Sequence, residues 1–428
     1  MRQRKTWFAM SGTLAVLAII LILPMSAGAA SQYKVLYRFK PSGDGANPLA
    51  QLIFDSRGNL YGTTNLGGAN GFGTVFRLTP GANGTWTETV LYDFCAALNC
   101  ADGAQPAAGL IFDTGGNLYG TTETYGAHGP SGGTVFRLAP TVKGKWTHTI
   151  LYSFCAVYKC KDGSQPWAGL IFDAAGSLYG TTFGGGVHQG GTVFKLTPGA
   201  KGKWIETVLH SFCAAKCTDG ADPFASLIFD AAGNLYGTAA NGGTYFDGTV
   251  FKLTPGAKGQ WTYTLLFTFN GKNGAGPVAG LISDAAGNLY GTADTGGDLG
   301  CNSGIGCGVV FKLAPGANGK WIETILHAFH SVPAYPVAGL ILDAAGNLYG
   351  TASEPVAGHF GVVFKLTPNA NGKWTYTVPH TFNGKDGAGP MASLISDASG
   401  NLYGTAASGG DLTGCSGSGC GVVFEIAP

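Results

Sequence analysis

The chain has 428 residues, of which 11% are charged and 72 are glycine, and its formal net charge is +1. Nucleic-acid-binding proteins usually carry a stripe or patch of basic residues, and this sequence contains none, so no nucleic-acid partner is expected. The glycine content favours tight turns and disfavours long helices.

The first thirty residues have the three parts of a secretory signal peptide. Arg2, Arg4 and Lys5 provide the basic part, residues 14–23 the apolar part, and residues 27–29 an Ala-Gly-Ala cleavage pattern. The alternative is an uncleaved membrane anchor, which would need about 20 apolar residues to span the bilayer. We therefore expect residues 1–30 to be removed and the mature chain to be secreted or periplasmic, with no membrane span.

After residue 30 the phrase Leu-Tyr-Gly-Thr occurs seven times, at intervals of 54 to 60 residues. A nearly fixed period of this size indicates a repeat architecture. The tyrosines of the seven copies are Tyr61, Tyr119, Tyr179, Tyr236, Tyr290, Tyr349 and Tyr403.

Four short runs of β-branched and aromatic residues, bounded by Gly, Pro, Asn or Asp, make up each repeat, as is typical of strands. In the third repeat we name them strand A (168–173), strand B (178–182), strand C (192–197) and strand D (204–212). Four antiparallel strands repeated seven times predict an all-β fold, a seven-bladed β-propeller that residues 31–428 form as a single domain.

The two ends of the repeat region predict how the ring closes. The chain ends on a C strand at 422–428 with no D strand after it, whereas a D-type strand stands alone at residues 33–39. The N-terminal strand would therefore complete the last blade and close the ring without a covalent link, leaving no open sheet edge there.

An Asp begins the link between strands A and B in every repeat. The seven carboxylates could form a metal-binding ring, but an Asp followed by Gly is also typical of an Asx-turn, and we favour the turn. These residues are Asp55, Asp113, Asp173, Asp230, Asp284, Asp343 and Asp397.

Ten cysteines fall into five close pairs, which in an exported chain indicates disulfides rather than zinc sites, because no C-x2-C spacing occurs. Three pairs lie in D–A connections and two in B–C loops, and these connections emerge on one face of an antiparallel meander. We call it the loop face and expect binding there, because varied loops on a rigid scaffold commonly carry function. The pairs are Cys95/Cys100, Cys155/Cys160, Cys213/Cys217, Cys301/Cys307 and Cys415/Cys420.

The D–A connections of six repeats also carry an acidic or amide residue followed by Gly, shortly before a Pro. These residues could form an acidic rim that holds Ca²⁺ through oxygen ligands, or they could be a turn motif that starts strand A, which we favour. They are Asp44, Asp102, Asp162, Asp219, Asn273 and Asp386.

Six of the eight histidines occupy two kinds of position. His210, His327 and His380 take the strand-D position of Tyr92 and Tyr152, so we interpret them as aromatic substitutes, whereas three others lie in B–C loops. His128 and His188 belong to neighbouring blades and could approach each other. We identify no catalytic residue, metal-ligand set or cofactor motif. The candidate ligand-binding residues are Asp102, Asp162, Asp219, His128, His188, His359 and Tyr335.

Strand A begins with a small, uncharged residue in every repeat. If strand A is innermost, the wall of the central channel is small and neutral, whereas an enzyme using that channel would need convergent acidic or basic side chains. These residues are Ala50, Gly109, Gly169, Ser226, Gly280, Gly339 and Ser393.

The recurring Gly-Leu-Ile-Phe-Asp-x-x-Gly-Asn-Leu-Tyr-Gly-Thr, followed by Gly-x-Val-Phe-Lys-Leu, resembles the bacterial GloVer tandem-repeat family over residues 33–428. The resemblance implies an exported repeat protein. With the loop pattern, it predicts a monomeric scaffold that binds a glycan, peptide or protein on the loop face without a cofactor. The alternatives are a propeller-type lyase, hydrolase or lactonase with a metal or His site on the same face, and a purely structural role.

Overall fold

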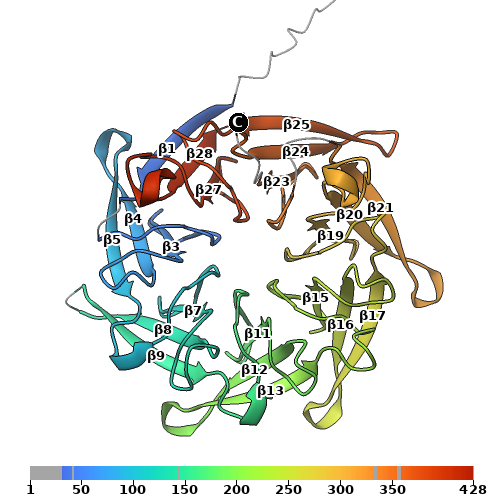
Figure 1. Ribbon diagram of the computed structural model, residues 1–428, viewed down its shortest axis with the longest axis horizontal. Coiled ribbons are helices and arrows are strands. Elements are labelled where there is room, and N and C mark those ends of the chain that lie inside the picture. The colour runs from blue at the N-terminus through green and yellow to red at the C-terminus, as the bar shows by residue number, and fades with distance from the viewer. Residues whose placement is uncertain (1–30, 41–42, 143, 331–334, 354–357, 428) are drawn as a thin grey trace, which may run out of the picture. The chain divides into compact units, whose positions relative to one another are not determined.

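The computed structural model describes residues 31–40, 43–142, 144–330, 335–353 and 358–427, so the predicted signal peptide lies outside the described residues. The described strands form seven four-stranded antiparallel sheets around a common centre (Figure 1). This arrangement confirms the predicted all-β, seven-bladed propeller.

Each blade follows the order A, B, C, D from the centre outwards. The first three blades are β2 (Ile53–Phe54), β3 (Leu60–Thr64), β4 (Thr74–Pro80) and β5 (Trp86–Asp93); β6 (Ile111–Phe112), β7 (Leu118–Thr122), β8 (Thr134–Pro140) and β9 (Trp146–Ser153); β10 (Ile171–Phe172), β11 (Leu178–Thr182), β12 (Thr192–Pro198) and β13 (Trp204–Ser211). The next three are β14 (Ile228–Phe229), β15 (Leu235–Ala239), β16 (Thr249–Pro255) and β17 (Trp261–Thr268); β18 (Ile282–Ser283), β19 (Leu289–Ala293), β20 (Val309–Pro315) and β21 (Trp321–Ala328); β22 (Ile341–Leu342), β23 (Leu348–Ala352), β24 (Val362–Pro368) and β25 (Trp374–Thr381). The seventh is β26 (Ile395–Ser396), β27 (Leu402–Ala406), β28 (Val422–Ala427) and β1 (Gln32–Arg38).

Helical structure in the described ranges is limited to three-residue 3₁₀ turns in the loops, as the glycine content predicts. These turns are Ala82–Gly84, Leu98–Cys100, Tyr158–Cys160, Ala200–Gly202, Ala257–Gly259, Asn302–Gly304, Ala317–Gly319 and Cys415–Gly417.

The seventh blade takes its outer strand from the other end of the described chain. β1 pairs antiparallel with β28, from Gln32 opposite Ala427 to Arg38 opposite Val422. Figure 1 shows this pairing as the blue strand lying along the red one. The predicted non-covalent closure of the ring is therefore confirmed.

Strand A is shorter than the sequence predicts. In the third blade only Ile171–Phe172 pairs with strand B, although residues 168–173 have a strand-like composition. The carbonyl oxygen of Ala168 instead accepts a hydrogen bond at 3.0 Å from Thr121 of the preceding blade. The start of the segment is thus bonded to the neighbouring blade rather than to its own sheet.

This threonine–alanine bond recurs at every junction between blades. The Thr of Leu-Tyr-Gly-Thr donates its hydroxyl proton to the carbonyl oxygen of an Ala in the next blade, as from Thr181 to Ala225 at 3.1 Å. Thr405 of the seventh blade donates to Ala50 of the first at 3.3 Å. The Thr405–Ala50 bond therefore also joins the last blade to the first. It lies near the centre of the propeller, whereas β1 closes the propeller at its outer edge.

The Asp of the A–B link forms the predicted Asx-turn. Asp230 Oδ1 accepts hydrogen bonds from the backbone N–H groups of Ala232 and Asn234, each at 2.9 Å. Its Oδ2 accepts the side-chain N–H of Asn234 at 2.6 Å and the Tyr236 hydroxyl at 3.1 Å. Burial acts to raise the pKa of Asp230, but these hydrogen bonds outweigh it and lower the pKa below its ordinary value. The Asp230 carboxylate therefore stabilises the A–B turn.

The hydrophobic core is divided among the interfaces between blades. Between blades three and four, Tyr179 and Phe212 pack with Leu227, Leu235 and Phe251. Equivalent clusters fill the other interfaces. Each blade is therefore stabilised mainly by its two neighbours, as in other repeat proteins.

The seven strand-A segments surround a central cavity of about 390 Å³. Its wall is uncharged, as predicted, and the first residue of strand A is small, with one correction in the first blade. Gln51, and not Ala50, takes the position of Gly109, because each stands four residues before the Asp of its A–B link. The two are neighbours in the ring, since a Cβ placed on Gly109 would lie 3.1 Å from the Gln51 carbonyl oxygen. The wall therefore contains one long polar side chain, whose amide nitrogen donates to the Leu394 carbonyl oxygen at 3.0 Å.

Candidate functional site on the loop face

Hydrogen bonds join the D–A and B–C connections into one layer. Ala104, in the connection that enters the second blade, pairs antiparallel with Thr124 in the B–C loop of that blade. The next residue, Gln105, donates its N–H at 2.9 Å to Phe72, in the B–C loop of the first blade. Each D–A connection is thus held between the B–C loops of two neighbouring blades, and both kinds of connection lie on one face.

All five predicted disulfides form in this layer. Three close the D–A connections that enter blades two to four, and two close the B–C loops of blades five and seven. The Cys100 carbonyl oxygen accepts the Gly126 N–H at 3.2 Å, and the Cys420 carbonyl oxygen accepts the Asn47 N–H at 2.9 Å. The disulfides therefore brace the loops at points where they contact one another. They join Cys95 to Cys100, Cys155 to Cys160, Cys213 to Cys217, Cys301 to Cys307 and Cys415 to Cys420.

The disulfide of Cys217 closes a shorter loop than the other two disulfides in D–A connections. Cys217 follows Cys213 by four residues, whereas the cysteines of the two preceding pairs are five residues apart. No 3₁₀ turn leads into Cys217, as one does into Cys100 and Cys160. Its carbonyl oxygen still accepts the Gly243 N–H, at 2.8 Å. The loop is therefore shorter than the other two, but it braces the next B–C loop in the same way.

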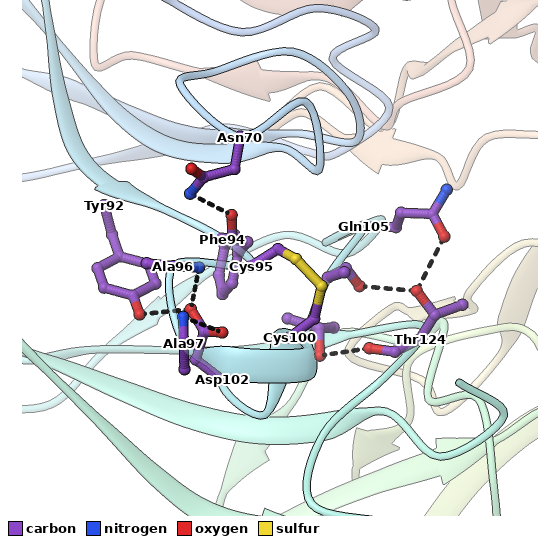
Figure 2. The surroundings of a disulfide bond; sticks show 12 residues. Asn70, Tyr92, Phe94, Cys95, Ala96, Ala97, Cys100, Asp102, Gln105 and Thr124 are labelled. Carbon is purple, nitrogen blue, oxygen red and sulfur yellow. Dashed lines mark hydrogen bonds between the residues drawn. A yellow bond between two sulfur atoms is a disulfide. The ribbon is translucent and has the colours of Figure 1, made fainter. Parts of the chain in front are cut away.

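The acidic residues of the first two of these connections have their carboxylates turned into the loops, as Figure 2 shows for Asp102. Asp102, which is 5% exposed, accepts the Tyr92 hydroxyl at 2.7 Å and the N–H groups of Ala96 and Ala97 at 2.9 and 3.0 Å. Asp162 makes the same three contacts in the next blade. These hydrogen bonds support the turn alternative over an acidic rim.

Asp219, two residues after Cys217, lacks part of this pattern. Its Oδ2 lies 3.0 Å from His210 Nε2, and the histidine thus takes the place of the tyrosine. Its Oδ1 is buried without a hydrogen-bond partner among the described residues, whereas Asp102 Oδ1 accepts a backbone N–H. The shared turn motif therefore holds for Asp102 and Asp162 and is incomplete at Asp219.

The strand-D histidines occupy aromatic positions, as the sequence analysis predicts. The His210 ring stacks on Tyr263 of the next blade with ring centroids 4.2 Å apart, and His327 stacks in the same way on Tyr376. Burial lowers the pKa of His327 to about 4, so its ring is neutral at pH 7. These rings therefore pack as neutral aromatic groups.

The remaining candidates are dispersed. His128, His188 and His359 are exposed on three B–C loops, and no hydrogen bond or ring contact joins His128 to His188 within the described ranges. Tyr335 is half-buried between blades five and six, and its N–H donates to the Cys307 carbonyl oxygen at 3.1 Å. Nowhere in the described part of the chain do three or more His, Cys, Asp or Glu side chains gather as a metal site would require.

Sequence reasoning missed the residue that follows Pro in each D–A connection. All seven of these side chains line the central cavity, at its loop-face end. Five are aliphatic, and two in adjacent blades are aromatic; a comparison of the seven Pro-x-Ala copies could have found this difference. The seven residues are Leu49, Ala107, Trp167, Phe224, Val278, Val337 and Met391.

An aromatic cluster therefore breaks the symmetry of the ring at blades three and four. The rings of Trp167 and Phe224 meet edge to face with centroids 5.6 Å apart. The ring centroid of Phe183 lies 4.6 Å from that of Phe224. Phe183 is the first residue after β11. The corresponding residues in blades two and five are Glu123 and Asp294, where burial raises the pKa of each carboxyl, that of Asp294 to about 6.

The backbone beside this cluster is held in an unusual conformation. Gln165, which precedes Pro166, has a φ of 55°, and the equivalent Asp222 has a φ of 57°. Residues other than glycine rarely adopt this left-handed region. The equivalent residues of the other blades adopt it too, with φ between 58° and 63° at Asn47, Gln105, Gly276, Tyr335 and Gly389, so the conformation belongs to the shared loop structure. Gln165 is held there because its N–H donates to Gly132 and its carbonyl oxygen accepts from Phe183, at 2.8 and 2.9 Å.

Comparisons with known proteins agree with this architecture. A family model described as the Gloeobacter/Verrucomicrobia repeat matches residues 24–154, 131–332 and 300–428. Comparison with curated proteins finds no match. Solved structures that are similar include an ulvan lyase of polysaccharide lyase family PL25, at 12% identity and a TM-score of 0.54 over 86% of this chain and 93% of that chain. A glucose dehydrogenase is similar at 13% identity and a TM-score of 0.45, over 93% of this chain and 99% of that chain. At such identities the likeness concerns the fold.

Proposed function

Because the chain belongs to the Gloeobacter/Verrucomicrobia repeat family and its repeats build a closed ring, we propose that it is an exported, monomeric binding scaffold. Its ligand, a glycan, peptide or protein, enters the mouth of the central cavity on the loop face. The five disulfides support an oxidising compartment outside the cytosol. No helix in the described ranges is long and apolar enough to cross a membrane.

The aromatic cluster at the cavity mouth is the observation that carries the proposal. Trp167 and Phe224 are half-buried, line the cavity and stand where five other blades have aliphatic side chains. A cavity of about 390 Å³ lies within the range of small-molecule sites, roughly 300–1,000 Å³. If this position served only to pack the seven blades together, blades three and four would not need a different side chain there.

The alternative function is catalysis, since an ulvan lyase is among the similar solved structures. None of the residues that line the cavity is acidic, basic or a histidine. Proton transfer by a positioned side chain is a common part of enzyme mechanisms, so this neutral wall favours binding over catalysis inside the cavity.

The proposal is tested by a thermal-stabilisation screen of glycans, peptides and proteins on the mature chain, residues 31–428. A ligand at a hundred times its Kd should stabilise the fold by about 2.7 kcal/mol. Trp167→Ala should abolish this stabilisation, whereas the matched control Met391→Ala, at the same repeat position, should retain it. Ligand stabilisation that is unchanged in both Trp167→Ala and Phe224→Ala would show that the site lies elsewhere.

A further inference from the structure

The cavity mouth has a polar feature directly below its aromatic pair. Residues two apart in an extended segment point to the same side, so Ser226 follows Phe224 on the cavity wall, and Gly169 follows Trp167. A Cβ placed on Gly169 would stand 2.9 Å from Ser226 Oγ. The absence of a side chain at Gly169 therefore makes room for the Ser226 hydroxyl, which lies beneath both aromatic side chains.

This hydroxyl is free to bind a ligand. Ser226 is half-buried in the wall, and its Oγ makes no hydrogen bond to any residue that the structure describes. The other side-chain polar groups of the wall are those of Gln51, whose amide nitrogen is already bonded, and Ser393. A ligand at the aromatic side of the cavity thus meets two aromatic side chains, the open Ser226 hydroxyl and no charge.

Ser393 provides an internal comparison within the same ring. Its Oγ stands over Gly339 as Ser226 Oγ stands over Gly169, and a Cβ on Gly339 would lie 2.8 Å from it. The side chains above this second hydroxyl are Val337 and Met391, which are aliphatic. The two arrangements therefore differ in the presence of an aromatic surface and share the hydroxyl–glycine contact.

We infer that the cavity mouth binds a neutral saccharide, with one sugar ring against Trp167 and Phe224 and a sugar hydroxyl bonded to Ser226. The polarised C–H groups on one face of a pyranose ring match the negative face of an aromatic ring, and its equatorial hydroxyls reach the wall beside it. A charged sugar would lose hydration without gaining an ionic partner, because no Lys or Arg lines the cavity. This inference rests on the proposed function, since it identifies the ligand of the same site.

The experiment measures binding to the mature chain by titration calorimetry and tryptophan fluorescence. The probes are neutral oligosaccharides of glucose, galactose, mannose and deoxyhexoses, uronic-acid oligosaccharides, and uncharged peptides. We expect at least one neutral series to bind, and the uronic-acid series to bind at least about tenfold more weakly. Trp167→Ala should weaken binding at least about tenfold, whereas Trp167→Phe, which retains an aromatic face, should restore most of it.

Matched variants test the hydroxyl. Ser226→Ala should weaken saccharide binding about two- to tenfold, the range of one hydrogen bond, whereas Ser393→Ala should leave it within about twofold. Equal thermal stability of the two variants without ligand shows that folding is not the cause.

Three outcomes overturn the inference. No neutral oligosaccharide binds at up to about 10 mM, the charged series binds best, or Ser393→Ala and Ser226→Ala weaken binding equally. If instead a peptide binds and Trp167→Ala abolishes that binding, the saccharide inference fails and the proposed binding function stands. If a ligand binds and no cavity variant affects it, the proposed site fails as well.

Discussion

Gly180 shows at the scale of one residue why the repeated phrase is so uniform. A Cβ at this position would lie 2.7 Å from Phe194 Cζ and 3.1 Å from Leu170 Cδ2, and Phe194 is fully buried. The equivalent glycine of each blade meets the corresponding Phe and Leu at 2.5 to 3.1 Å. Glycine is therefore required by packing rather than by a left-handed backbone.

We predict that Gly180→Ala lowers the free energy of unfolding by about 1–3 kcal/mol, because the added methyl group overpacks a filled core. Urea denaturation of the mature chain measures the change. Gly280→Ala is the control, since its Cβ would make only an ordinary contact at 3.4 Å, and it should leave stability unchanged or slightly raised. Equal losses in the two variants would contradict the packing explanation.

Glu206 is a second residue whose role depends on its surroundings. It lies on β13 near Asp162, in the D–A connection that enters the same blade, and burial together with the Asp162 charge raises the pKa of Glu206 to about 8. Its Oε1 is buried without a hydrogen-bond partner in the described structure. The folded state therefore holds a proton that the unfolded chain releases above about pH 4.5.

The sign of the pH effect follows from this raised pKa. The Glu206 carboxyl imposes no penalty below about pH 4.5, and stability is lost as the pH rises from there to about 8. Glu206→Gln removes the titrating group, so its Tm should exceed that of the parent at about pH 8.5 by more than it does at about pH 5. Scanning fluorimetry at both pH values measures this; the same difference in Tm at both would refute the assignment.

At the scale of one element, β1 is the strand on which ring closure depends. Phe39, immediately after β1, is fully buried, donates its N–H to Gly421 at 3.0 Å and packs edge to face on Phe76 of the first blade, with ring centroids 5.1 Å apart. It thus joins the N-terminal strand to both the last and the first blade.

We predict that Phe39→Ala lowers the free energy of unfolding by about 3–5 kcal/mol, the cost of a large cavity in a buried site. Chemical denaturation measures the loss, and Val142→Ala, at a fully exposed residue, is the neutral control. A loss below about 1 kcal/mol for Phe39→Ala would show that β1 contributes little to closure.

The loop elements were predictable only in part. The close spacing of each cysteine pair indicated its partner, and strand phase placed the pairs on one face. The sequence favoured the turn alternative for Asp102 and Asp162, but it did not show which groups their carboxylates contact: each accepts one hydroxyl from a strand-D tyrosine and two backbone N–H groups of the loop. A buried carboxylate requires such partners, and only the folded loop shows whether they are present.

The loop closed by Cys217 also shows that hydrogen bonds within a loop cannot be predicted from the sequence. Its spacing from Cys213 is one residue shorter than in the two preceding pairs. That difference is visible in the sequence, but its consequence is not: Asp219 keeps its strand-D partner and leaves Oδ1 without a partner among the described residues. A change of one residue in a tight loop alters which backbone N–H groups point inward, and only the structure shows which are lost.

At the scale of the whole molecule, repetition made the architecture readable and obscured the site. The seven similar repeats each indicate the same blade structure. A comparison based on what the repeats share therefore overlooks residues that differ in only one or two repeats, such as Trp167 and Phe224. These two residues lie 57 positions apart in the sequence, and their rings touch because adjacent blades place equivalent residues side by side. The approach of Ser226 Oγ to Gly169 arises in the same way.

The sequence by itself determined the strand pattern, the blade number, the orphan strand at residues 33–39 and the disulfide partners, because each follows from local spacing or from the count of repeated units. Only the tertiary structure decided which side chains line the cavity, that the Gln51 amide bonds to Leu394 of the seventh blade, and that two aromatic side chains meet at the cavity mouth. Those relations join neighbouring blades across dozens of residues, and the closed ring alone determines the distances between them.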